Sequence, residues 1–226
     1  MTRHQMRGRF ITFEGGEGSG KSSHAAMLAE HLKAKGIDVL LTREPGGSPG
    51  AEIIRHIILS GAAKPLGAET ETILFASARD DHLQTSIRPA LARGTWVISD
   101  RFADSTRVYQ GVVGEVDQRL IDGLERITVR DTRPDLTFVL DVPAELGMAR
   151  ALKRRAGEGA DRFESEALEY HEKLRAAYRD LVAREPQRCV LIDSTLPREQ
   201  VAAQIWQTVQ SRLDPAALLD VGKIAP

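Results

Sequence analysis

The stretch RFITFEGGEGSGKSS, residues 9–23, decides the first part of the fold. It opens with a short, mostly apolar run that predicts a buried strand. The segment GGEGSGKS, residues 15–22, then matches the pattern G-x-x-x-x-G-K-[ST]. A helical pattern begins at Ser22 and ends near Lys35, and Gly36 stands where a residue that ends a helix is expected. This order of strand, glycine loop and helix predicts a loop that binds the phosphates of a nucleoside triphosphate.

Each part of this phosphate loop has a physical role in the prediction. The residues expected to bind ATP are Gly15, Gly16, Glu17, Gly18, Ser19, Gly20, Lys21 and Ser22. Glycines allow a tight turn with inward-pointing backbone N–H groups, and the helix N-terminus adds the positive end of its dipole. We expect Lys21 to reach the β- and γ-phosphates and the Ser22 hydroxyl to bind Mg²⁺. The alternative is a merely structural glycine turn, and the pattern does not choose among kinase, switch and motor.

Strand-like and helix-like segments alternate along the whole chain. The strands are expected at 9–14, 37–42, 95–100, 135–142 and 188–193, and the helices at 22–35, 51–59, 68–92 (interrupted before Pro89), 117–130, 144–154, 165–184 and 198–212. Three of the strand segments are nearly continuous in apolar residues, as in parallel sheets buried on both faces. The alternation predicts an α/β fold: a doubly wound five-stranded parallel sheet flanked by helices, in a single domain over 1–213. Residues 214–226 are expected to form a C-terminal tail.

Polar residues stand at the carboxyl ends of several predicted strands. They are Glu14, Arg43 with Glu44, Asp100 with Arg101, and Asp141. Ligands of open parallel sheets bind beyond these ends. We therefore expect charged residues that are far apart in the sequence to meet in one site at one edge of the sheet.

Composition narrows the classes of function. The chain has 226 residues and a net charge of −1, which gives no large basic field for non-specific nucleic-acid binding. Nucleic acid is therefore not expected as a partner. No apolar run suits a signal peptide or a membrane span, so a membrane is not expected as a partner either. The single cysteine, Cys189, suits a reducing compartment and hence a cytoplasmic protein. The six histidines lack metal-ligand spacing and are interpreted as structural or surface residues, and the absence of asparagine excludes an N-K-x-D guanine motif.

Further segments carry a resemblance to a known family. They are TREPGG (42–47), LFASARDDHL (74–83), SDRFADSTRVYQG (99–111) and RPDLTFVLDV (133–142). With the phosphate loop, these segments closely resemble the bacterial thymidylate kinases, from about Phe10 to about Leu213. The resemblance implies a P-loop nucleoside monophosphate kinase fold with a lid, phosphorylation of dTMP to dTDP by ATP and Mg²⁺, and a homodimer.

The resemblance assigns two arginines and a carboxylate to the acceptor phosphate. Arg101 matches the arginine that holds this phosphate, which a guanidinium can grip at two oxygens, and Arg55 matches a second arginine nearby. Glu44 matches a carboxylate near the phosphates and the metal. Without the resemblance, Arg55 fits a solvated helix face and Glu44 a loop charge.

Other matched residues surround the base and the sugar. Phe75 matches the residue that stacks on the base, and Arg79, one helical turn further, suits the O4 acceptor of thymine. Cytosine has an amino donor at that place, so Arg79 is expected to disfavour it. Thr106, Tyr109 and Gln110 match positions beside the base and deoxyribose, where a tyrosine ring leaves no room for a 2′-hydroxyl.

Glu17 is the unusual residue, because it places a carboxylate in a loop that binds anions. In the thymidylate kinases an acidic side chain at this place approaches the acceptor nucleotide and accepts a hydrogen bond from its 3′-hydroxyl. The alternative is that Glu17 only tunes the charge of the loop.

Phe75 and Arg79 have alternative interpretations as well. Phe75 fits a core aromatic, and Arg79 fits an ion pair with Asp80 or Glu71.

The segment RALKRRAGEGADRFE, residues 150–164, is expected to form the lid. Some thymidylate kinases place a catalytic arginine in the phosphate loop, and this chain does not. The resemblance therefore assigns that charge to the lid, at Arg154 and Arg162, with Arg155 as an alternate; a basic solvated helix end is the plainer interpretation.

The predicted catalytic residues are thus Lys21, Arg101, Arg154 and Arg162, and the predicted metal ligands are Ser22 and Asp100. For Asp100 a strand-end cap is the alternative. Two other functions stay open at this point: another nucleoside monophosphate or deoxynucleoside kinase, and a P-loop switch or regulatory ATPase.

Overall fold

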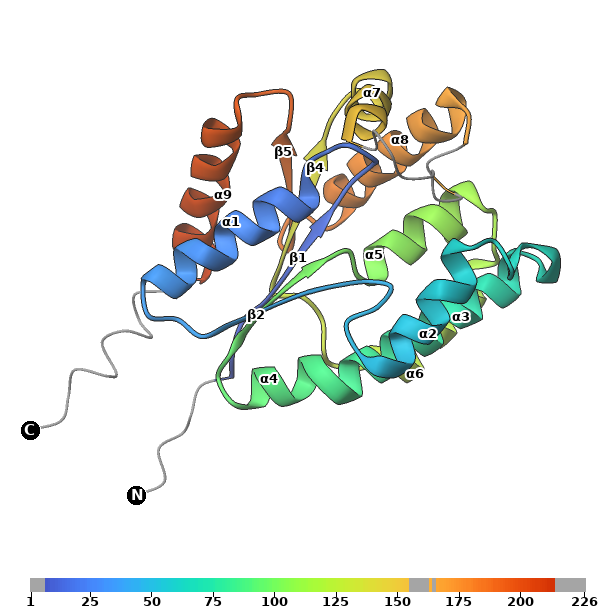
Figure 1. Ribbon diagram of the computed structural model, residues 1–226, viewed down its shortest axis with the longest axis horizontal. Helices are drawn as coiled ribbons and strands as arrows, with labels where there is room; N and C mark the ends of the chain where they lie inside the picture. Colours follow the sequence, from blue (N-terminus) through green and yellow to red (C-terminus); the bar gives the residue numbers. More distant parts are fainter. Residues whose placement is uncertain (1–6, 155–162, 164–165, 214–226) are drawn as a thin grey trace, which may run out of the picture.

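The computed structural model describes residues 7–154, 163 and 166–213. Its centre is a parallel sheet with the strand order β2–β3–β1–β4–β5 (Figure 1). The strands are β1 (Phe10–Glu14), β2 (Val39–Arg43), β3 (Trp96–Asp100), β4 (Leu136–Asp141) and β5 (Cys189–Asp193). All five predicted strands are present, and the predicted doubly wound α/β fold is confirmed.

Helices cover both faces of this sheet (Figure 1). They are α1 (Lys21–Ala34), α2 (Pro49–Leu59), α3 (Ala68–His82), α4 (Arg88–Ala92), α5 (Ala103–Thr106), α6 (Gln118–Thr128), α7 (Ala144–Arg154), α8 (Leu168–Arg184) and α9 (Arg198–Leu213), with a 3₁₀ turn at Lys64–Leu66 and π-helical turns at Leu83–Ile87 and Arg107–Val113. None of the helices in the described part of the chain is long and apolar enough to cross a membrane.

The side-chain alternation of β1 divides the core into two layers. Ile11 and Phe13 point to the face that α1 and α9 cover, and they share one apolar cluster with residues of both helices. Phe10 points to the opposite face and packs with Leu83 and Phe102. A strand buried on both faces fits the continuous apolar run that predicted it.

The helix that follows the phosphate loop ends as its sequence predicts. Gly36 has φ 79°, a left-handed conformation that glycine adopts without steric cost. Its N–H donates to the carbonyl of Lys33 at 2.9 Å, and the N–H of Ile37 donates to that of Leu32 at 3.1 Å. This pair of hydrogen bonds satisfies carbonyl groups left open at the helix end.

Two helical segments differ from the prediction. The interruption before Pro89 is a π-helical turn, so the chain continues in helical form into α4. The segment 103–113, for which no helix was predicted, forms α5 and a second π-helical turn. Packing of Val108 and Tyr109 against α8 holds this segment in place, and such a contact between distant parts of the chain leaves no local pattern in the sequence.

Candidate active site

The phosphate loop lies at the carboxyl end of β1, beside the end of β3, because Phe13 pairs with Asp100 across the two strands. Gly18 has φ 63°, and a Cβ there would lie 2.0 Å from the carbonyl oxygen of Gly147. The loop therefore packs closely against α7, and its conformation excludes a side chain at this position. Gly15 and Gly20 also have positive φ.

Lys21 folds back over the loop from the first residue of α1. Its Nζ donates to the carbonyl of Gly16 at 2.7 Å and to Ser19 Oγ at 3.3 Å. Burial, followed by the charge of Arg101, lowers the pKa of Lys21 to about 8. An ammonium group that is held over the loop and weakly solvated is suited to bind a phosphate.

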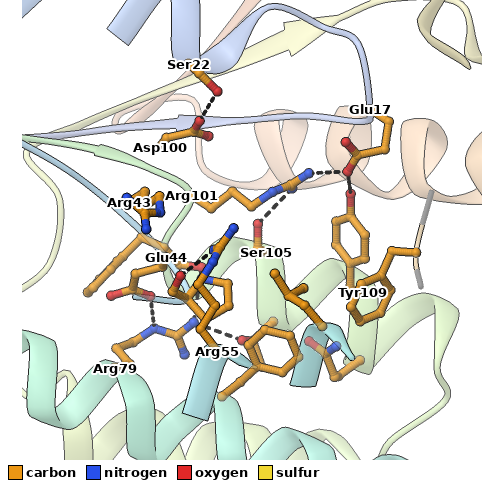
Figure 2. A pocket seen from close by; sticks show the side chains of 17 residues that line it. Glu17, Ser22, Arg43, Glu44, Arg55, Arg79, Asp100, Arg101, Ser105 and Tyr109 are labelled. Carbon is orange, nitrogen blue, oxygen red and sulfur yellow. Dashed lines mark hydrogen bonds and ion pairs between the residues drawn. The ribbon is translucent and has the colours of Figure 1, made fainter. Parts of the chain in front are cut away.

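Ser22 and Asp100 meet where the first turn of α1 approaches the end of β3. The Ser22 hydroxyl donates to Asp100 Oδ2 (Figure 2). A hydroxyl and a carboxylate beside a phosphate loop are oxygen ligands of the kind Mg²⁺ prefers, and Mg²⁺ completes such a shell with waters and substrate phosphates. Within the residues that the structure describes, no group of three or more His, Cys, Asp or Glu gathers as a metal site of another kind.

A cavity of about 240 Å³ lies next to the phosphate loop (Figure 2). It brings together all the residues that the sequence assigned to the acceptor and the metal: Glu17, Ser22, Glu44, Arg55, Phe75, Arg79, Asp100, Arg101, Thr106, Tyr109 and Gln110. These residues come from the loop, the first turn of α1, the segment after β2, α2, α3, β3 and the segment after β3. The polar ends of strands therefore meet at one edge, as the sheet topology requires.

Arg101 joins this cavity to the phosphate loop. Its Nη2 donates to Glu17 Oε1 at 2.5 Å, and its Nη1 donates to the carbonyl of Gly15 and to Ser105 Oγ, each at 3.2 Å. The guanidinium lies 5.0 Å from the centroid of the Tyr109 ring. Arg101 has φ 72°, an uncommon value for a residue with a side chain. Such a conformation, held by several bonds, aims the side chain at the loop.

Glu17 turns from the phosphate loop into the cavity. It accepts from Arg101 and, at 3.2 Å, from the Tyr109 hydroxyl (Figure 2). The carboxylate therefore faces the side on which the sequence places the acceptor sugar.

Arg79 and Glu44 form a buried pair on the opposite wall. Arg79 Nε donates to Glu44 Oε2 at 2.8 Å, and both side chains are almost completely buried. Arg79 Nη2 also donates to Thr106 Oγ1 at 3.0 Å and to the carbonyl of Phe102 at 3.3 Å. The ion-pair partner of Arg79 is thus Glu44, which neither interpretation of the sequence had named.

The remaining predicted acceptor residues line the same space. Arg55 of α2 donates to the carbonyl of Pro45 at 2.6 Å. Phe75 of α3 is half-buried and lines the cavity, so it does not lie in the closed core. Tyr109 and Gln110 are buried on the π-helical turn after α5.

Two of the predicted catalytic residues fall at or beyond the edge of the description. Arg154 is the last residue of α7, and its side chain lies outside the described part of the structure. Arg162 and the alternate Arg155 lie outside the described residues, as do most of the predicted lid and the tail 214–226.

The sequence assigned Ser105 to no site, and it named Arg43 only as one of the strand-end residues expected to meet at this edge. Ser105 bonds both Arg101 and the buried carboxylate of Glu14, which it meets at 2.6 Å. Arg43 lines the cavity and pairs with Glu52 at 2.9 Å. Ser105 stands inside the quoted motif SDRFADSTRVYQG, so its proximity to matched residues was the available signal. Asp141 is at the same sheet edge but is bound by Arg175 and Arg179 of α8.

Comparison with known proteins places this geometry in a family. Residues 13–205 match the family model described as thymidylate kinase. The chain is 60% identical over 208 residues to the thymidylate kinase of Rhodopseudomonas palustris strain BisB18, covering 92% of this chain and 90% of that protein. It is 55% identical over 221 residues to that of Bradyrhizobium diazoefficiens, covering 97% of each.

A solved structure gives the same result. The crystal structure of thymidylate kinase from Ehrlichia chaffeensis superposes with a TM-score of 0.71 at 32% identity, covering 90% of this chain and 99% of that one. Sequence and structure thus agree over almost the whole described chain, and this chain belongs to the thymidylate kinase family.

Proposed function

We propose that this enzyme transfers the γ-phosphoryl group of ATP to dTMP and releases dTDP. The observation that carries the proposal is the contact of Arg101, in the acceptor cavity, with Glu17 and Gly15 of the phosphate loop. Because Arg101 links the two, a phosphate in the cavity and the terminal phosphate on the loop would be neighbours. That is the arrangement that direct transfer between two nucleotides needs.

On the donor side, Lys21 and the loop N–H groups hold the phosphates of ATP. Ser22 and Asp100 are proposed to hold Mg²⁺, which neutralises phosphate charge when it is bound. Lys21 contributes a second positive charge at the β- and γ-phosphates.

On the acceptor side, different walls of the cavity bind the phosphate, the sugar and the base of dTMP. Arg101 and Arg55 bind the phosphate of dTMP, and Glu17 accepts from the 3′-hydroxyl. Phe75 stacks on the base, and Arg79 donates to the O4 of thymine. Thr106, Tyr109 and Gln110, with Glu44 behind Arg79, complete the walls.

The transfer itself needs no covalent enzyme intermediate. An oxygen of the acceptor phosphate attacks the γ-phosphorus in line, and the enzyme supplies orientation and positive charge. Lys21 and Arg101 act from the described site, and Arg154 and Arg162 are proposed to act from the lid. The acceptor phosphate is already a nucleophile, so no strong general base is required.

The enzyme is proposed to act as a homodimer in the cytoplasm. Large apolar side chains are exposed on three neighbouring helices: Ile53 and Ile57 on α2, Ile73 on α3 and Ile127 on α6. In Figure 1 these helices lie together on one side of the molecule. An exposed apolar face of this kind is typical of a surface that a second copy covers.

A coupled assay of ADP formation with dTMP, dUMP, dCMP and thymidine tests the function. We expect the highest kcat/KM with dTMP and little ADP without an acceptor. Thymidine as the best acceptor would leave Arg101 without a phosphate to bind and would contradict the proposal. ADP formation that needs no acceptor would instead indicate a regulatory ATPase.

A further inference from the structure

His82 is the last residue of α3 and lies three positions beyond Arg79. Its side chain is completely buried. Its Nδ1 is 3.1 Å from Glu44 Oε1, and its Nε2 is 2.8 Å from Thr42 Oγ1. The imidazole therefore links β2, the loop after β2 and the helix that carries Arg79.

The partners of His82 decide where its proton lies. An ionised carboxylate only accepts hydrogen bonds, so Nδ1 donates to Glu44. A neutral imidazole then accepts at Nε2, and the Thr42 hydroxyl is able to donate there. The Thr42 contact is thus compatible with the tautomer that the Glu44 carboxylate selects.

Glu44 is consequently held at both oxygens by residues of one helix. Oε1 accepts from His82, and Oε2 accepts from Arg79 Nε at 2.8 Å. Arg79 Nη2 is engaged as well, so Nη1 is the nitrogen of this guanidinium without a hydrogen bond among the described residues. The orientation of Glu44 therefore helps to set the orientation of the Arg79 guanidinium, together with Thr106 and the carbonyl of Phe102.

The surroundings leave the imidazole little freedom. Gly47 has φ 84°, and a Cβ at this position would lie 2.4 Å from both His82 Nε2 and Thr42 Oγ1. The loop backbone is thus packed directly onto the pair. A ring so enclosed holds its partner in one orientation, which is what positioning a second side chain requires.

We propose that His82 is a positioning residue that holds Glu44 and thereby aims Arg79 at the base of the acceptor. His82 then helps to set the preference for a base with an oxygen acceptor at position 4 over a base with an amino group there. This inference rests on the proposed role of Arg79 in reading thymine.

Two variants at one position separate positioning from simple packing. In His82→Asn the amide nitrogen replaces Nδ1, which keeps the donor to Glu44 and loses Thr42. In His82→Gln the amide nitrogen replaces Nε2, which keeps the contact with Thr42 and loses the donor to Glu44. Both variants shorten or open the same buried ring, so their loss of stability, measured by thermal unfolding, is the matched control.

The readout is the ratio of kcat/KM for dTMP to that for dCMP. His82→Gln is expected to lower this ratio about tenfold, the effect of losing one hydrogen bond to a charged group. His82→Asn is expected to lower it only about threefold, because it loses the contact with Thr42 and keeps the donor to Glu44. The ratio for dTMP to dUMP is expected to stay unchanged, because both bases present the same O4. Equal dTMP:dCMP ratios in the two variants would overturn the inference.

Arg79→Lys distinguishes the two ways in which the idea fails. A wild-type dTMP:dCMP ratio in Arg79→Lys would contradict the role of Arg79 in reading the base. A lowered dTMP:dCMP ratio in Arg79→Lys, together with a wild-type ratio in His82→Gln, would contradict only the role of His82. Should both His82 variants unfold at the assay temperature, Thr42→Val carries the test, with a ratio lowered about threefold as the expected result and an unchanged ratio as the contrary one.

Discussion

Arg101 Nη2 lies 2.5 Å from Glu17 Oε1, and this contact joins residues that are 84 positions apart in the sequence. It ties the segment after β3 to the phosphate loop at the place where two nucleotides would exchange a phosphoryl group. The Arg101 guanidinium, which is proposed to bind the acceptor phosphate, therefore donates to the carboxylate of Glu17 in this structure.

Glu17→Ala tests whether this carboxylate also reads the acceptor sugar. We expect the wild-type enzyme to prefer dTMP over 3′-deoxy-dTMP, because only dTMP has the 3′-hydroxyl that donates to Glu17. The variant is expected to lose most of this preference, about 1 kcal/mol or more. The ratio of the two kcat/KM values measures it, since any effect through Arg101 is common to both substrates. A preserved ratio would leave Glu17 with the loop-charge role only.

Lys21→Ala tests the division of labour between the two sides of the site. Because Lys21 lies on the phosphate loop, kcat is expected to fall by about 100-fold or more, while dTMP binding stays close to that of the wild type. Steady-state kinetics with calorimetric titration of dTMP separates these quantities. Equal losses in kcat and in dTMP affinity would argue against the assigned role.

Phe75→Ala tests base stacking. The half-buried ring lines the cavity, so its removal is expected to weaken dTMP binding by roughly 1–3 kcal/mol. Calorimetric titration measures this change, and urea unfolding of the same variant provides the control. A lower free energy of unfolding with an unchanged dTMP affinity would instead indicate that Phe75 is a core aromatic.

Glu14 gives the protein a specific dependence on pH. Burial, followed by the charge of Asp104, raises the pKa of Glu14 from 4.5 to about 7. Between these values the folded chain holds a proton that the unfolded chain has lost, so stability falls as the pH rises through this window. Relative to Glu14→Gln, the wild type is expected to lose roughly 3 kcal/mol between pH 4.5 and pH 7. Urea unfolding at several pH values checks this, and parallel profiles for the two proteins would be the contrary result.

The apolar face on α2, α3 and α6 predicts the oligomeric state. Ile53→Glu with Ile127→Glu is expected to convert a dimer to a monomer, because it places charges in the proposed contact. Leu152→Glu, on the exposed surface of α7, is the matched control and should leave the dimer intact. Sedimentation velocity measures the mass, and a wild-type monomer would refute the dimer.

Local patterns in the sequence were sufficient for most of the fold. The five strands follow from short apolar runs, and the end of α1 follows from Gly36, because burial and backbone conformation act over a few neighbouring residues. The segment 103–113 had no such pattern, and its helical form depends on packing against α8. Cys189 is buried on β5, and burial raises the pKa of its thiol to about 12.

In the site, too, the sequence predicted what depends on local patterns and strand topology, but not the contacts between distant side chains. Strand ends and motifs located Arg101, Glu17 and Asp100, since topology alone brings strand ends together. The bonds of Glu44 to Arg79 and His82 cross 35 and 38 positions, and no local rule predicts which carboxylate a buried arginine will choose. The spacing of His82, three residues beyond Arg79 on α3, places the two on one side of the helix, but spacing alone does not predict the shared carboxylate.

The phosphate loop and the Asp100–Arg101 segment are proposed to face each other across the space of one phosphoryl group. The most direct test is a crystal structure with a bisubstrate analogue that links adenosine and thymidine through a chain of phosphates. We expect one continuous phosphate chain from Lys21 to Arg101, with the Arg101 guanidinium on the thymidylate phosphate. An analogue whose thymidylate phosphate lies outside the cavity, away from Arg101, would contradict the account.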